Sequence, residues 1–411
     1  MISRLVLLWI IGLPLLLAQS LQQQDILRLA RIKGAIRKHL DGMPNYTCLQ
    51  TVERYRRLPD GKNESLIDVL RLEVAYVAGR ELFAWPGSTR FEDTELRDIV
   101  STGAFSTGSF ALHARAIFLG DGTTFSYGGE EIFEGKPAWR FNYATAQFRS
   151  GYQIRNPKKG IRAAVAYHGS IWADRRNYDL LRIAIETGDI PPEIEIEQAR
   201  DQLDYQLMKI GTTEALLPRQ SEIQITDNKG NVGINRTRLS RCKQYSGEST
   251  LSFEDTADVV LESVKPQRIL VFEPHTELEL ALESAIDHES SAVGDEIQAT
   301  LRNNIRIGKN IIAAKGSIAK GRIVRLEHHE GDYSTYNITL LFEELTGPDW
   351  RAPLKLRLIR THPMTGLPRD LRQRTNTVRS ISFPESDTNG FLVFSKKLKL
   401  PHGFTTIWQT Q

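Results

Sequence analysis

Alternating apolar and polar residues run through most of the chain between residues 45 and 253. In the segment 166–187, two such runs flank a turn at 174–177, and Leu181, Ile183 and Ile185 share one face of the second run. A half-buried antiparallel strand requires this period of two. The same pattern recurs at 46–52, 67–77, 123–127, 138–143, 204–210, 215–226 and 232–253. The pattern therefore predicts a long antiparallel meander.

Two segments have a helical period instead. In 22–40, apolar residues recur at helical spacing, with Lys33 as an interruption. In 91–119 we expect two short helices separated by Ser, Thr and Gly residues at 101–109. A cover split in this way could lift from the sheet to admit a guest chain. The alternative is that two short helices simply fit the curvature of the sheet.

The remaining pattern divides the chain. A polar segment at 256–267 ends in Lys265-Pro266 and predicts a linker between a domain at 21–255 and a second domain at 268–411. The second domain alternates short apolar runs with glycine-containing turns, which predicts an all-β barrel or sandwich. Residues 361–388 contain three prolines and many Arg, Thr and Ser, and predict a long excursion.

The first twenty residues have the composition of a signal peptide. Arg4 precedes an apolar run at 5–17, and the small residues Ala18 and Ser20 permit cleavage before Leu21. This run is shorter than the roughly 20 residues of a membrane-spanning helix. We therefore expect a periplasmic or secreted mature chain without a transmembrane segment; an uncleaved anchor is the alternative.

Composition adds few constraints. The 411 residues are 40% hydrophobic and 25% charged, which is ordinary for globular proteins and fits two domains. A net charge of +3 gives no reason to expect a nucleic-acid partner. The two cysteines, Cys48 and Cys242, fall on the first and last predicted strands of the meander. In an oxidising compartment we expect them to form a disulfide; two separate buried thiols are the alternative.

The N-terminal region resembles the LolA/LolB and MucB/RseB-like group of bacterial envelope proteins. The similarity rests on an exported chain opening with an amphipathic helix, on HGSIWADRRNYDLLRI, on the break DIPPEIEIE followed by DYQLMKIG and LLPRQSEIQIT, and on the meander itself. It covers residues 22–253. It implies an antiparallel half-barrel sheet covered by helices, so the predicted fold class is α+β with a C-terminal all-β domain. It also implies that the protein holds acyl chains or senses lipoproteins.

Two further resemblances concern other parts of the chain. GDEIQATLRNNIRI and IIAAKGSIAKGRIVRL are similar to TrbI-like periplasmic barrels at Gly294, Asp295, Gly316, Ser317 and Gly321. The whole chain resembles exported proteins of soil bacteria that carry NYTC near the start and RCKQYSGES late. The latter similarity implies nothing about activity.

Catalytic motifs lack support from their surroundings. Ser317 and Lys320 match S-x-x-K, but K-T-G is missing and the motif falls on a strand pattern. His328 and His329 would point to opposite faces of a strand, so a shared metal ion is disfavoured. His168 lies beside Trp172 without a nucleophile nearby. We therefore predict a protein that is not an enzyme and has no cofactor or metal site.

The predicted function is the binding of a hydrophobic ligand on a curved sheet. The ligand would be an acyl chain, a lipoprotein or a peptide, and envelope proteins are possible partners. The predicted ligand-binding residues are Trp139, Phe141, Tyr143, Trp172, Leu181, Ile183 and Ile185. Trp139, Phe141 and Tyr143 could instead form a filled core. The alternative function is a structural component of an envelope complex that has no small-molecule site; a hydrolase is a third.

Overall fold

The computed structural model describes residues 6–77, 79–88, 91, 112–156, 159–245, 268–330, 334–361 and 389–411. For residues 6–21 and 112 it describes the backbone alone. The predicted linker 256–267, residues 92–111 of the predicted helical segment and nearly all of the excursion 361–388 therefore lie outside the described residues.

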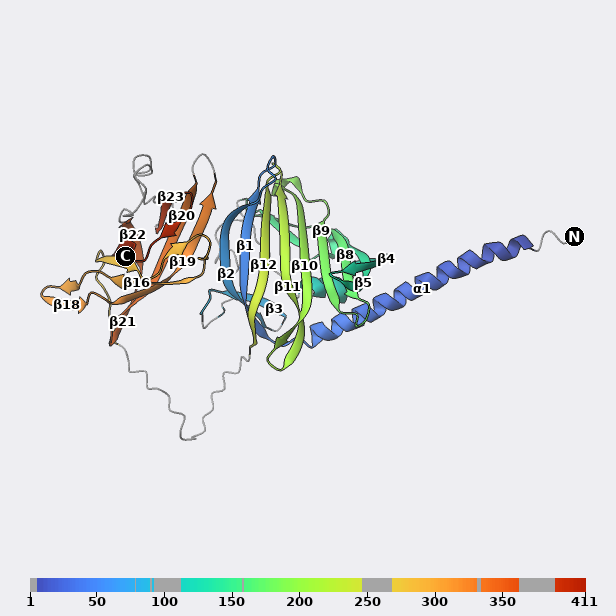
Figure 1. Cartoon of the computed structure of the whole chain (residues 1–411), viewed down its shortest axis with the longest axis horizontal. Helices are drawn as coiled ribbons and strands as arrows, with labels where there is room; N and C mark the ends of the chain where they lie inside the picture. The colour runs from blue at the N-terminus through green and yellow to red at the C-terminus, as the bar shows by residue number, and fades with distance from the viewer. Residues whose placement is uncertain are drawn as a thin grey trace, which may run out of the picture.

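The N-terminal half is built on one curled sheet of ten strands (Figure 1). Neighbouring strands along it are antiparallel. In spatial order they are β3 (Arg80–Ala84), β2 (Ser65–Val77), β1 (Tyr46–Arg57), β12 (Val232–Gln244), β11 (Thr213–Asp227), β10 (Ile196–Ile210), β9 (Leu180–Thr187), β8 (Tyr167–Asp174), β5 (Lys136–Thr145) and β4 (Thr123–Phe133). The chain thus closes its first strand, β1, against its last, β12.

Polar turns set the register of the hairpins. Between β11 and β12, one carboxylate oxygen of Asp227 accepts hydrogen bonds from the backbone amides of Lys229 at 2.8 Å and Asn231 at 2.9 Å. Between β8 and β9, Asp174 accepts one from the amide of Arg176 at 2.8 Å. Carboxylates of this kind stabilise turns because they satisfy amides that no strand partner reaches. The turn at 174–177 was predicted from the sequence, and it is present.

The predicted α+β class is wrong. The described residues contain two α-helices, α1 (Val6–Asp41) and α3 (Leu112–Leu119), against strands β1 to β25, so the fold is mostly β with a curled half-barrel sheet. The helices pack against one part of the sheet, around β5, β8, β9 and β10. Beside β1 and β2, buried residues such as Val52 and Leu72 belong instead to a hydrophobic cluster shared with the second domain. Strands therefore replace part of the expected helical cover.

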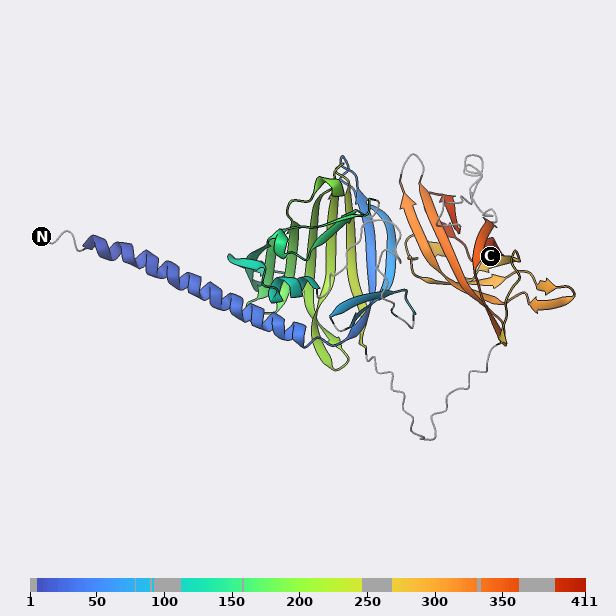
Figure 2. The ribbon, with the colours of Figure 1, turned by 180° about the vertical axis from the view of Figure 1, so that it is seen from behind.

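Helix α1 packs against the sheet through the C-terminal part that was predicted to be amphipathic. Ile32, Ile36 and Leu40 are buried, and the opposite end of the helix extends beyond the sheet (Figure 2). Lys33 interrupts the apolar stripe. Its Nζ lies 4.3 Å from the centre of the Phe125 ring, a cation–π contact that accommodates the charged group on this face of the helix. Burial, and secondarily the charge of Arg37, lowers the pKa of Lys33.

The second domain is formed by strands throughout its described residues. Its main sheet runs β13 (Arg268–Ile269), β21 (Trp350–Pro353), β20 (Thr335–Thr346), β19 (Ile318–His329), β16 (Glu296–Leu301), β14 (Glu277–Leu282), β25 (Thr405–Thr410) and β22 (Leu356–Thr361), and β23 (Gly390–Phe394) pairs with β20. Short two-stranded sheets pair β15 (Ile286–Asp287) with β24 (Lys399–Leu400), and β17 (Ile305–Ile307) with β18 (Asn310–Ala313). In the N-terminal half, β6 (Gln153–Asn156) pairs with β7 (Ile161–Ala164).

The two halves meet at the edge of β2. The backbone amide of Arg71 donates a hydrogen bond to the carbonyl of Val293 at 2.8 Å. The backbone amide of Val293 donates one to the carbonyl of Val69, also at 2.8 Å. Arg71 also places Nη1 2.6 Å from a carboxylate oxygen of Asp295. Gly294, which lies between Val293 and Asp295 in the sequence, has a φ of +99°. A Cβ atom at this residue would lie 2.3 Å from the carbonyl oxygen of Arg71. Only glycine fits this approach, so Gly294 and Asp295 hold the second domain on the first sheet.

The predicted disulfide between Cys48 and Cys242 is confirmed, with Cα atoms 4.1 Å apart. The pairing of β1 with β12 shifts register at Cys48, so that Thr47 pairs with Lys243 and Leu49 with Ser240. Two residues of β12 therefore oppose one of β1, as in a β-bulge. The bond joins strands that are already neighbours in the sheet, 194 residues apart in sequence.

Candidate functional site

An aromatic cluster covers the inner face of the sheet under the helices. Trp139, Phe141 and Tyr143 alternate along β5 and are all buried. They belong to one hydrophobic cluster with Ile183 and Ile185 of β9. Residues of α1 and α3 close this cluster from above: Ile32, Ile36, Leu40, Ala114, Ile117 and Phe118. The inner face is thus an apolar layer between the sheet and the two helices.

The ring of Tyr143 crosses the neighbouring strand at Gly169. Tyr143 pairs with Gly169 in the ladder, and its hydroxyl donates to the carbonyl of Ala184 on the next strand at 2.9 Å. A Cβ atom on residue 169 would lie 1.9 Å from that carbonyl oxygen and 3.1 Å from the Tyr143 hydroxyl. The glycine of the HGSIW segment is therefore required by packing, because the tyrosine needs the space above it.

The structure brings together most of the residues predicted to bind ligand. Trp139, Phe141, Tyr143, Ile183 and Ile185 form the cluster described above, and Leu181 is also buried. Trp172 lies elsewhere: it pairs with Arg140 and Arg182 on the other face, and its Nε1 donates to Glu131 at 2.8 Å. Their role in binding stays a prediction.

Two ionisable groups meet inside this apolar layer. Asp201 of β10 is 3% exposed, and its Oδ2 lies 3.5 Å from Nε2 of His113 on α3. Neither carboxylate oxygen of Asp201, nor that histidine nitrogen, has a hydrogen-bond partner of ordinary geometry among the described residues. Burial raises the pKa of Asp201 to about 7, although the Gln202 amide lowers it in part. Burial lowers the pKa of His113 to about 4, so this contact is not an ion pair at neutral pH.

Tyrosines surround the Asp201–His113 pair. The ring of Tyr152 stacks on His113 with centroids 5.6 Å apart, and Tyr152 is in turn 5.8 Å from Tyr167. Burial raises the pKa of Tyr152 and of Tyr205, with the Asp201 charge as a further cause. The Tyr205 hydroxyl has no hydrogen-bond partner among the described residues. Unpaired polar groups inside a protein are costly, so this arrangement calls for a physical reason such as a ligand or water.

Sequence reasoning missed Asp201 and His113. Ala199, Asp201 and Leu203 occupy alternate positions of β10 that face inward. A carboxylate between two apolar residues of this face was the sequence signal that could have identified Asp201. His113 falls in the predicted helical segment 91–119, where its inward direction cannot be read from the sequence. The hypothesis that the split helical cover lifts from the sheet concerns residues that lie mostly outside the described ones. It stays a prediction.

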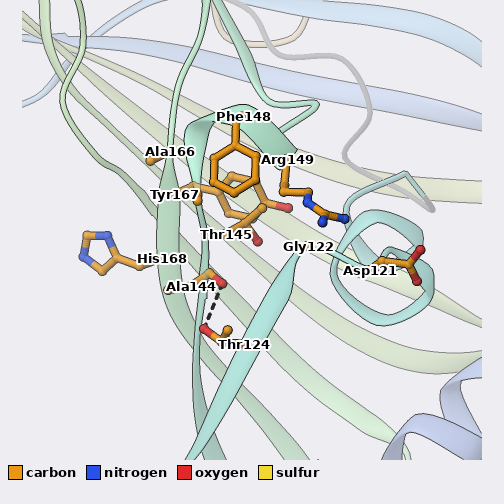
Figure 3. Close-up of a pocket in the computed structure, with 11 residues that line it drawn as sticks. Asp121, Gly122, Thr124, Ala144, Thr145, Phe148, Arg149, Ala166, Tyr167 and His168 are labelled. Carbon is orange, nitrogen blue, oxygen red and sulfur yellow. Dashed lines mark hydrogen bonds between the residues drawn. The ribbon is translucent and has the colours of Figure 1, made fainter.

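A groove of about 580 Å³ opens beside the aromatic cluster, at the ends of β4, β5 and β8 (Figure 3). It is lined by Asp121, Gly122, Thr124, Ala144, Thr145, Ala146, Phe148, Arg149, Ala166, Tyr167 and His168. Phe148 is 85% exposed, and the Arg149 guanidinium lies 5.7 Å from its ring centre. Tyr167 lines the groove and also belongs to the aromatic cluster, with its ring 6.2 Å from that of Tyr143. Tyr167 therefore joins the groove to the inner face.

The other candidates have structural roles in the part of the chain that is described. Ser317 donates to the carbonyl of Ala314 at 2.7 Å, and His328 stacks on Tyr336 with ring centroids 4.5 Å apart. Within the described ranges, no three His, Cys, Asp or Glu side chains are grouped closely enough to hold a metal ion. Among the helices in those ranges, none is both long and apolar enough to cross a membrane.

Comparisons with known proteins find limited similarity. No family model matches the chain, and no curated protein matches it. Three solved structures cover about half of it: a domain described as an outer membrane lipoprotein-sorting protein from Vibrio parahaemolyticus, a LolA superfamily protein from Nitrosomonas europaea, and a DUF1329 family protein from Desulfovibrio piger.

The similarity to these structures is low. In the same order, the identities are 13%, 11% and 13%, and the TM-scores are 0.29, 0.26 and 0.26. The matches cover 53%, 52% and 55% of this chain and 93%, 93% and 96% of the others. The structures that match about half of this chain thus include a lipoprotein-sorting domain and a LolA superfamily protein, and the MucB/RseB-like and TrbI-like resemblances gain no support. At such TM-scores the likeness identifies no function for this chain.

Proposed function

We propose that the N-terminal half-barrel of an exported protein binds a hydrophobic ligand, either an acyl chain, free or on a lipoprotein, or an apolar peptide. The observation that carries this proposal is the groove of about 580 Å³ that meets the aromatic cluster at Tyr167. Its volume falls within the roughly 300–1,000 Å³ of small-molecule sites. The disulfide supports an oxidising compartment, periplasmic or extracellular.

The groove is suited to an amphipathic molecule. Ala144, Ala146, Ala166 and Phe148 provide apolar surface. The side chain of Arg149 lies beside Phe148 and points toward the turn of Asp121 and Gly122 at the groove wall (Figure 3). Arg149 forms no ion pair among the described residues, so its charge is available to an anionic headgroup. The ligand would lie with its chain against the alanines and Tyr167. It would extend inward only if α3 moves, because the cluster beneath is filled by α1 and α3.

A filled core also favours the second candidate, a structural component of an envelope complex. Phe141, Tyr143, Ile183 and Ile185 are each at most 3% exposed, so they offer a ligand no surface unless the helices shift. In this second function the groove would be empty of any bound molecule, and the protein would act through its surfaces. The two candidates therefore differ in whether the purified chain takes up an apolar molecule.

Mass spectrometry of organic extracts and uptake of a fluorescent acyl probe test the proposal. We expect a co-purified lipid or saturable probe uptake, and we expect Ala144→Trp, which fills the groove, to lower probe affinity at least tenfold. Ala314→Trp places the same ring at an exposed alanine of the second domain and is the control. Absence of both lipid and uptake, with the chain folded, would contradict ligand binding and favour the structural role.

A further inference from the structure

The hairpin of β17 and β18 extends from the second domain on the side away from the N-terminal sheet (Figure 1 and Figure 2). Within the described residues, each of its strands pairs with the other alone. Its base is fixed, because Ile305 and Ala313 are buried in the core of that domain. The free end of the hairpin is therefore held outward on a rigid base.

The end of the hairpin carries an exposed isoleucine on each face. Ile307 is 48% exposed and Ile311 is 49% exposed. Ile307 pairs with Asn310, whereas Ile311 pairs with Arg306, so the two isoleucines project from opposite faces of the ribbon. A partner protein packed against one face would leave the other isoleucine in water. Insertion of the tip into a lipid layer would cover both, which favours a membrane as the occupant.

The charge of this segment has a single sign. Residues 302–316 contain Arg302, Arg306, Lys309 and Lys315 and no acidic residue. None of these four side chains forms an ion pair among the described residues. Glu279 of β14 is near the base, and it accepts a hydrogen bond from the Asn303 amide. Basic residues close to apolar ones are suited to a surface of anionic lipid, where each cation strengthens binding by roughly fivefold.

We propose that the β17–β18 hairpin inserts its tip into the headgroup region of an anionic lipid bilayer. Ile307 and Ile311 enter the boundary of the acyl chains, Arg306 and Lys309 contact lipid phosphates, and Arg302 and Lys315 near the base add attraction from farther away. This contact uses none of the residues of the groove or of the aromatic cluster, so it does not depend on the proposed ligand binding. It gives the second domain a function of its own, which is to hold the chain at a membrane surface.

A probe at the tip tests this insertion locally. The oxidised full chain carrying Asn310→Cys is labelled with the environment-sensitive fluorophore NBD and mixed with vesicles of phosphatidylcholine, with or without phosphatidylglycerol. We expect NBD emission to rise and shift to the blue only with phosphatidylglycerol, and high salt to reverse the change. The same label at Lys62→Cys, an exposed turn of the first domain, should not respond. No response at residue 310, or an equal response to neutral vesicles, overturns the proposal.

Variants separate the apolar and charged contributions. The double variant Ile307→Ser with Ile311→Ser keeps the charge of the hairpin. We expect it to bind anionic vesicles at least tenfold more weakly, as measured by the NBD label at residue 310. Ile132→Ser, at another exposed isoleucine, is the control. Arg306→Gln with Lys309→Gln should weaken binding by roughly 25-fold, whereas Lys62→Gln with Lys229→Gln should not. Equal binding by wild type and both hairpin variants overturns the proposal. Uptake of the acyl probe should be unchanged in all of them, so failure here is distinct from failure of ligand binding.

Discussion

Nε2 of His113 lies 3.5 Å from Oδ2 of Asp201, and desolvation displaces the pKa values of the two groups in opposite directions. Asp201 has a pKa of about 7 in the fold against 3.8 for an unperturbed aspartate, so its contribution to stability falls as pH rises from 4 to 7. His113 has a pKa of about 4 against 6.5, so its contribution rises with pH between 4 and 6.5. In the wild type the two dependences largely cancel.

Single substitutions should expose each dependence. In Asp201→Asn, the free energy of unfolding should rise between pH 4 and 6.5 by about 3 kcal/mol more than in the wild type, and the variant should be more stable than the wild type at pH 8. In His113→Gln, it should instead fall between pH 4 and 7, by about 3 kcal/mol relative to the wild type. Urea unfolding at each pH measures both effects. Variant curves that run parallel to the wild-type curve would contradict these protonation states.

The close packing of Tyr143 over Gly169 makes a second prediction. Gly169→Ala should destabilise the protein by about 2–4 kcal/mol, because the new Cβ atom overlaps the carbonyl of Ala184 and the ladder must separate. Tyr143→Phe should cost about 1 kcal/mol, because it removes one hydrogen bond and leaves the ring in place. Thermal unfolding measures both changes. Equal, small effects of the two substitutions would show that the strands accommodate a side chain at 169.

The sequence predicted the strands better than it predicted the faces and contacts. The alternation that identified 166–187 as a hairpin does not decide the side of Trp172, because both faces of β8 carry large residues. Its outward neighbours, Phe133 and Glu131, come from β4, about forty residues earlier. Likewise the Gly294-Asp295 pair suggested another family, whereas it contacts Arg71. Contacts between segments this distant in sequence depend on the tertiary fold, which a local period does not contain.

The disulfide supports a third prediction. Reduction, or Cys48→Ser with Cys242→Ser, should lower the free energy of unfolding by up to about 5 kcal/mol, since the bond closes a loop of nearly 200 residues in the unfolded chain. The effect should appear in unfolding rather than in acyl-probe uptake, because the bond lies on β1 and β12, away from the groove. Urea unfolding with and without reductant measures it. An unchanged transition midpoint on reduction would contradict the expected stabilisation.

The last prediction concerns the close approach of Gly294 to Arg71. We expect the two domains to unfold together, because residue 293 forms backbone hydrogen bonds with the edge of β2. Gly294→Ala should disrupt this edge, since its Cβ atom would lie 2.3 Å from the Arg71 carbonyl. Gly316→Ala is a matched control, because Gly316 has a similar φ of +93° but no atom within 4 Å of a new Cβ. Asp295→Asn should weaken the contact by only about 1 kcal/mol, because the Arg71–Asp295 pair is partly exposed. Calorimetry should show one transition in the wild type and two in Gly294→Ala, with faster amide exchange at Arg71 and Val293. One unaltered transition in Gly294→Ala, with protection of both amides retained, would show that this edge does not couple the domains.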